Sequence, residues 1–292
     1  MNRRTKTFVS MKRPTTALVL GGGGSKGALQ AGFYRAVSEL GIKIDLVVAA
    51  SIGALNGAFI ASGMRPRVMM QEWARVRRRD IFSFNWDLLR RGAGAQSIYT
   101  ARNLRRFLEE RLPVRSFDEL PIPFVAVTTD IQTGRPYLWK SGDLLEAVLA
   151  SCAIPGIFPP MRGPLDRWVI DGALADNVPV GTALALGADR VVGILCQQGP
   201  ERAAEKRGIA RILGRAFGIA TDRKWRLEAP RYSQRPEVLI IDPVHDIQVD
   251  ALDFSRGAAL AQVGYQSSLQ VLSLWLEDLY ARETREGPRR IA

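Results

Sequence analysis

The chain has 292 residues, 47% of them hydrophobic, which is enough for one large hydrophobic core or two small ones. No apolar run approaches the roughly 20 residues of a membrane-spanning helix, and the two cysteines, Cys152 and Cys196, match no metal-binding or redox spacing. The formal net charge of +12 favours anionic partners such as membrane surfaces or acidic substrates, with solvated basic faces as the alternative.

The first residues are basic and contain no acid, but the apolar stretch of a secretory signal does not follow them. We therefore predict a flexible basic tail over 1–14. The lack of cysteine pairing motifs favours free buried thiols in a reducing compartment, so we expect a cytoplasmic protein, peripheral at the membrane. No nucleic-acid partner is expected, because no nucleic-acid-binding module is recognisable.

A short apolar strand is predicted over 17–20, and it leads into a glycine-rich loop over 21–27 and a helix over 28–40. A strand followed by a glycine loop and a helix start brings several backbone N–H groups to one point, which binds anions. This segment is therefore a candidate anion-binding site.

Three chemistries use such a loop. A P-loop places glycine directly before its lysine, whereas here Ser25 precedes Lys26. A dinucleotide site agrees with the G-x-G-x-x-G spacing of 22–27, but the acid it needs about 20 residues later, Asp45, begins the next strand instead of ending it. The third use, an oxyanion hole, holds the negative charge that develops on a carbonyl oxygen under attack.

The next strand, predicted over 46–50, ends abruptly at Ser51, and a helix is predicted over 52–62. A serine at such a sharp strand-to-helix turn is typical of a nucleophile elbow, whose usual pattern is G-x-S-x-G. Gly53 fits the pattern and Ala49 replaces its first glycine. The alternative is a serine that caps an ordinary helix.

Residues 65–112 are basic, and we expect them to be helical. Their aromatic side chains pack into the core or, alternatively, form a membrane-docking or lid surface. A strand over 123–130, a partner strand over 135–140 and a helix over 144–152 follow. The aromatic side chains of 65–112 are Trp73, Phe82, Phe84, Trp86 and Tyr99.

Asp171 ends the next predicted strand and is followed by small residues. A carboxylate held beside a serine can act as its general base, and burial would raise its pKa toward that task. Taken alone, Asp-Gly is also a common turn.

The rest of the chain completes an α/β pattern. We predict a helix over 179–187, a strand over 189–196, a mobile basic excursion over 197–235 with a helix near 209–219, and a strand over 237–242. A long amphipathic helix over 254–282 and a tail over 283–292 end the chain.

The single histidine, His245, follows Ser51 and Asp171 in the chain order of an α/β-hydrolase triad. A histidine-dependent esterase is therefore an alternative. The elbow, however, falls on the second predicted strand, which is early for that fold, and the glycine loop directly precedes it.

Together these segments resemble the patatin-like phospholipase family over about residues 17–273. Gly22 to Gly27 resemble its glycine-rich oxyanion loop, 49–53 its elbow, and Asp171-Gly172-Ala173 its D-G-[G/A] motif. Further similarity lies in ASCAIPGIFPP (150–160), Thr129-Asp130, Thr133-Gly134 and Gly264-Tyr265.

This resemblance implies a three-layer α/β/α sandwich with a mostly parallel central sheet, formed by a single catalytic domain over 15–282. It implies a lipid acyl hydrolase in which Ser51 attacks a lipid or phospholipid ester and Asp171 accepts its proton. Amides of Gly22, Gly23 and Gly24 would form the oxyanion hole.

Lys26 would brace the loop or contact a phosphate, with a solvated lysine as the alternative. The resemblance implies no metal and no cofactor. The net positive charge, separately, allows peripheral contact with anionic membrane through the basic surface. A non-catalytic lipid-binding protein of the same fold remains the second hypothesis, and a nucleotide-binding oxidoreductase is disfavoured.

Overall fold

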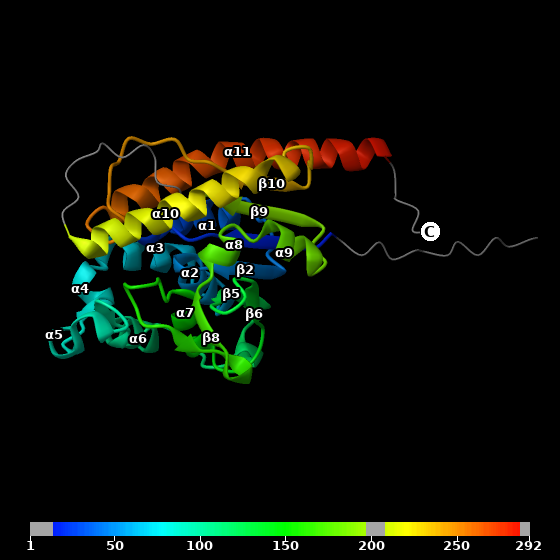
Figure 1. Ribbon diagram of the computed structural model, residues 1–292. Helices are drawn as coiled ribbons and strands as arrows, with labels where there is room; N and C mark the ends of the chain where they lie inside the picture. Colours follow the sequence, from blue (N-terminus) through cyan, green and yellow to red (C-terminus); the bar gives the residue numbers. More distant parts are fainter. Residues whose placement is uncertain (1–13, 197–207, 287–292) are drawn as a thin grey trace, which may run out of the picture.

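A computed structural model describes residues 14–196 and 208–286 (Figure 1). The predicted tail over 1–14 lies outside the described residues except for Pro14, as do residues 197–207 of the predicted excursion and 287–292 of the predicted C-terminal tail.

An eight-stranded sheet forms the centre of the fold, with the order β10-β9-β1-β2-β5-β8-β7 and with β6 also paired to β5. The first five of these strands run parallel, whereas β6, β7 and β8 are joined antiparallel. The strands are β1 (Thr16–Leu20), β2 (Leu46–Ala50), β5 (Phe124–Asp130), β6 (Pro136–Trp139), β7 (Met161–Arg162), β8 (Trp168–Asp171), β9 (Arg190–Ile194) and β10 (Val238–Ile241).

Helices cover both faces of this sheet (Figure 1). They are α1 (Ala28–Glu39), α2 (Ile52–Ala61), α3 (Pro66–Arg75), α4 (Arg78–Ile81), α5 (Asp87–Arg91), α6 (Arg102–Glu109), α7 (Leu144–Ser151), α8 (Ala173–Asp176), α9 (Val180–Ala185), α10 (Ile209–Glu228) and α11 (Gly257–Glu286). Within the described ranges, no helix combines the length and the apolar character that crossing a bilayer takes.

Alternation along the strands produces two cores. Leu18 and Leu20 of β1 pack with α1, α2, α7 and α11, whereas Ala17 and Val19 pack with α9 and Trp225 of α10. Successive side chains of a strand point to opposite faces of the sheet, so an apolar strand such as β1 fills both layers. The predicted three-layer α/β/α sandwich with a mostly parallel sheet is thereby confirmed.

Two segments differ from the expectation. Residues 65–112 are not continuously helical, because β3 (Ser83–Phe84) pairs with β4 (Tyr99–Thr100) and the backbone N–H of Asn85 donates to Ile98 O at 3.0 Å. Of the aromatic side chains there, Trp73 is buried, as a core role requires, but Trp86 is 70% exposed.

The helix expected near 209–219 is longer. It continues to Glu228 because Thr221 and Trp225 are buried against the body of the protein, where the Trp225 ring stacks on Tyr232 at 6.2 Å between ring centroids. Similarly, α11 extends to Glu286, four residues into the predicted tail.

Candidate active site

Ser51 stands between β2 and α2 with φ 55° and ψ −131°, a backbone conformation that non-glycine residues rarely adopt. Such strain persists only where the surrounding structure holds it, and it is typical of functional turns. Its side chain makes no capping hydrogen bond to α2. Instead, its hydroxyl donates to Asp171 Oδ2 over 2.6 Å, so the interpretation of Ser51 as an ordinary helix cap is wrong.

Close packing explains the small residues around this turn. A Cβ added to Gly53 would lie 2.2 Å from Leu20 O, a backbone atom that cannot move aside without moving β1. The methyl group of Ala49 is fully buried next to Gly57, where a Cβ would lie 3.2 Å from it. Ala49 is therefore accommodated on the side of α2, and the departure from G-x-S-x-G leaves the turn intact.

Two residues at the end of α7 hold the backbone of Ser51. The Ser51 N–H donates to Ser151 Oγ over 2.9 Å, the Ser151 hydroxyl donates to Val127 O over 2.6 Å, and Cys152 Sγ donates to Ser51 O over 3.2 Å. Sequence reasoning assigned no role to Ser151 or Cys152. Their position at the end of a helix whose other residues, apart from Glu146, are apolar was the available signal.

Asp171 reaches Ser51 through the register of the sheet. Ala50 is paired with Val127 of β5, and the next residue of β5, Thr128, is paired with Asp171 of β8. Ser51 and Asp171, 120 residues apart in the chain, therefore lie at the same level on either side of β5.

The Asp171 carboxyl group is fully buried, and this burial raises its pKa from 3.8 to about 7. Hydrogen bonds from the Ser51 hydroxyl to Oδ2 and from the Ala173 N–H to Oδ1 (2.9 Å) favour the ionised form and oppose the rise. Thr129 Oγ1 also donates to the Asp171 backbone carbonyl over 2.7 Å. The result is an oriented carboxylate with a pKa close to neutral pH, which suits a general base.

The glycine loop lies directly against the serine. A Cβ on Gly22 would lie 3.0 Å from Ser51 Cβ, and one on Gly23 would lie 2.3 Å from Cys196 Cβ. The Gly22 N–H donates to Asn177 Oδ1 over 2.9 Å, so it is occupied. In the part of the chain that the structure describes, the N–H groups of Gly23 and Gly24 have no recorded hydrogen-bond partner.

Lys26 is only 3% exposed, so its interpretation as a solvated lysine is wrong. It takes part in a polar or electrostatic interaction, and its positive charge acts on the pKa values of Cys196 and His245. Cys196 lies against the glycine loop at Gly23. The burial of Lys26 beside this loop is consistent with a bracing role for its side chain.

His245 is not brought to the carboxylate. Within the described residues, the Asp171 carboxylate accepts hydrogen bonds from the Ser51 hydroxyl and from the backbone N–H of Ala173. The buried Nδ1 of His245 has no hydrogen-bond partner there. Burial, followed by the charge of Lys26, lowers the pKa of His245. This geometry does not favour a histidine-dependent triad.

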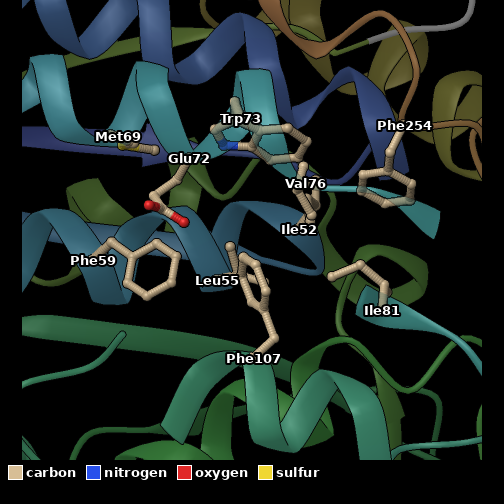
Figure 2. Close-up of a pocket in the computed structure, with 10 residues that line it drawn as sticks. All are labelled: Ile52, Leu55, Phe59, Met69, Glu72, Trp73, Val76, Ile81, Phe107 and Phe254. Atoms are coloured by element: carbon tan, nitrogen blue, oxygen red, sulfur yellow. The ribbon is translucent and has the colours of Figure 1, made fainter. Parts of the chain in front are cut away.

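A narrow apolar pocket begins at Ile52, the residue after the serine (Figure 2). Its single acid, Glu72, is paired, since Arg111 Nε donates to Glu72 Oε2 over 2.6 Å. The free volume is only about 10 Å³, so the side chains nearly fill the pocket in this conformation. The lining residues are Ile52, Leu55, Phe59, Met69, Glu72, Trp73, Val76, Ile81, Phe107 and Phe254.

Metal-ligand side chains do not gather elsewhere in the described ranges: no group of three His, Cys, Asp or Glu residues there is arranged to hold a metal ion. Cys152 and Cys196 are both buried and free. Burial raises the pKa of the Cys196 thiol to about 12, which keeps it protonated.

The chain is similar in sequence to proteins that contain a patatin-like phospholipase domain. The chain is 32% identical over 182 residues to patatin-like phospholipase domain-containing protein 7 of Rattus norvegicus and 33% identical over 184 residues to protein 6 of that name in Homo sapiens. These matches cover 61% and 62% of this chain but only 13% of each relative's length.

Among solved structures, VipD from Legionella pneumophila has a similar fold, with a TM-score of 0.50 at 15% identity over 90% of this chain and 67% of that one. The sequence model of the patatin-like phospholipase family matches residues 18–184, which include the glycine loop, Ser51 and Asp171. Because this match spans more than half of the sequence, the chain belongs to the patatin-like phospholipase family.

Proposed function

We propose that this protein is a lipid acyl hydrolase in which Ser51 is the nucleophile and Asp171 the general base. The observation that carries the proposal is the 2.6 Å hydrogen bond between the Ser51 hydroxyl and Asp171 Oδ2, made by a serine with a strained backbone. Membership of the patatin-like phospholipase family supports lipid esters as the class of substrate.

In the proposed reaction, Ser51 Oγ attacks the ester carbonyl carbon while its proton passes to Asp171 Oδ2. The tetrahedral intermediate then expels the alcohol, which takes the proton from Asp171, and leaves the acyl group on Ser51. Water then attacks this acyl-enzyme and gives its proton to Asp171. The second tetrahedral intermediate releases the fatty acid as Asp171 returns the proton to Ser51 Oγ. A base with a pKa of about 7 accepts a proton near neutral pH more readily than an ordinary aspartate.

The oxyanion is assigned to the N–H groups of Gly23 and Gly24. The N–H of Gly22 already bonds to Asn177, so Gly22 contributes by its lack of a side chain, which lets the loop approach Ser51. Lys26 is assigned to bracing the loop. Asn177→Ala frees the loop at Gly22, and we expect it to lower kcat by about tenfold to a hundredfold with little change in KM.

The pocket that begins at Ile52 is the proposed acyl site, because it is apolar and adjacent to the nucleophile. Its small free volume means that side chains there move when an acyl chain enters. We further propose that the protein is cytoplasmic and binds peripherally to membranes, where a lipid substrate would be found.

The test is hydrolysis of p-nitrophenyl butyrate and of phospholipid vesicles by the parent protein, Ser51→Ala, Asp171→Asn and His245→Ala. We expect losses of at least 10²-fold in the first two and near-parental rates in His245→Ala. Loss in all three folded proteins would support a histidine triad instead. An inactive parent that also resists a fluorophosphonate reagent at Ser51 would favour a lipid-binding protein without catalysis.

A further inference from the structure

Most of the large aliphatic side chains of helix α10 face away from the body of the protein. The residues it buries against the protein are Gly214, Gly218, Thr221 and Trp225. With about 100° between successive residues, these four positions lie on one side of the helix. Small and polar residues therefore make most of the contact with the body, and the large aliphatic side chains are left for the other side.

The outward side of α10 is an apolar stripe. On the helix its residues span an arc of roughly 120° centred opposite the buried face. Ile212 and Ile219 are 56% and 51% exposed, and Ile209 and Leu227 are more exposed still. The stripe consists of Ile209, Ile212, Leu213, Ala216, Ile219, Ala220 and Leu227.

Basic side chains accompany this stripe. Arg223 falls within the arc, Arg226 lies along one edge, and both are exposed. Exposed aliphatic residues with arginine beside them on one helix are typical of a helix that lies in the plane of a membrane surface, with its apolar face among the acyl chains and its cations at the phosphates.

The position of α10 connects the stripe to the proposed active site. The helix contacts α8, which begins two residues after Asp171 (Figure 1). Near its start, Leu213 lies over the loop that follows Cys152, where a Cβ on Gly156 would be 2.8 Å from Leu213 Cδ1. Helix α10 therefore lies over the segments that follow Asp171 and Cys152, close to Ser51, which is itself only 3% exposed.

We propose that α10 is a membrane-docking helix whose apolar stripe inserts into the headgroup region of an anionic lipid surface. Charge favours lipid over a second copy of the chain, because two chains of net charge +12 with arginines beside the stripe repel each other. Docking itself does not require catalysis. Only its purpose, delivery of lipid to Ser51, rests on the proposed function.

The experiment is co-flotation with vesicles of phosphatidylcholine alone or with 30% phosphatidylglycerol. Ile212→Ser/Ile219→Ser removes two exposed side chains of the stripe, and we expect its partition to anionic vesicles to fall by about tenfold or more. The matched control is Ile131→Ser/Val244→Ser, which removes two aliphatic side chains of similar or greater exposure elsewhere and should bind as the parent does.

Arg223→Gln/Arg226→Gln should lose the preference for phosphatidylglycerol, and parental binding should weaken with added salt. Ser51→Ala should float as the parent does, so docking is measured whether or not the protein hydrolyses lipid. Ile212→Ser/Ile219→Ser should also retain the parental rate on soluble p-nitrophenyl butyrate while losing rate on vesicles.

Undiminished flotation of Ile212→Ser/Ile219→Ser would overturn the proposal. So would equal binding to neutral and anionic vesicles. A parental dimer in light scattering that Ile212→Ser/Ile219→Ser converts to a monomer would assign the stripe to a second copy and overturn it as well.

Discussion

Replacing Asp171 by Asn should make the protein inactive and more stable at the same time. Asn keeps the size of the side chain and an oxygen that accepts the Ala173 N–H, but it has no charge and accepts no proton from Ser51. We expect kcat/KM at pH 8 to fall by about 10²–10⁴-fold, the usual contribution of a general base.

The stability gain follows from the pKa. Folding raises the pKa of Asp171 from 3.8 to about 7 by burying it, so the folded protein binds this proton more tightly than the unfolded chain does. Ionised Asp171 therefore opposes folding by about 4 kcal/mol above pH 7, at about 1.4 kcal/mol per pKa unit. Asn avoids this penalty, which declines below pH 7 and disappears near pH 4.

Thermal unfolding followed by circular dichroism at several pH values measures the effect. At roughly 2 °C per kcal/mol for a chain of this size, Asp171→Asn should melt about 8 °C above the parent at pH 8 and at the same temperature near pH 4. Asp246→Asn, which changes an exposed carboxylate, is the matched control and should show no such pattern. An Asp171→Asn protein that is no more stable than the parent at pH 8 would refute the reasoning.

The same pKa predicts the pH dependence of hydrolysis. Only ionised Asp171 accepts the proton of Ser51, so kcat/KM should rise with pH and level off above about 7. A rate already at its plateau at pH 5 would mean that Asp171 titrates as an ordinary carboxyl group or is not the base.

Two further substitutions test how the turn is held. Gly53→Ala places a Cβ 2.2 Å from Leu20 O and should destabilise the protein by on the order of 3 kcal/mol. Its control, Gly63→Ala, lies in open space at φ 86° and should cost only about 1 kcal/mol. Equal melting temperatures of the two variants would contradict this contrast. Ser151→Ala leaves the buried Ser51 N–H without its acceptor and should cost about 1–3 kcal/mol and lower kcat/KM, so unchanged melting and kinetics would contradict its role.

Much of the fold could be predicted from the sequence because it depends on local chemistry. Apolar runs and helical spacing located β1, β2 and α2 to within a residue or two, since period and length distinguish strand from helix within one segment. Ser51 and Asp171 were likewise identified by their places at the ends of predicted strands, and the structure brings the two together. Their catalytic roles, that of Lys26 and the single domain over 15–282 stay predictions.

Packing between distant segments decided the rest. The partners of the loop and the turn, Asn177 and Ser151, are 155 and 100 residues from Gly22 and Ser51, beyond any local pattern. The sequence predicted only a helix near 209–219. The contact that α10 makes with the body of the protein through Gly214 and Gly218 is what leaves its aliphatic side chains facing outward.

The pKa of Asp171 shows why this division exists. An aspartate at a strand end is visible in the sequence, but desolvation depends on all the atoms around the carboxyl group, which come from β2, β5 and α8 as well as β8. The sequence determined which residue stands there. The tertiary structure alone decided that this aspartate is fully buried, that it is hydrogen-bonded to Ser51, and that its pKa is about 7.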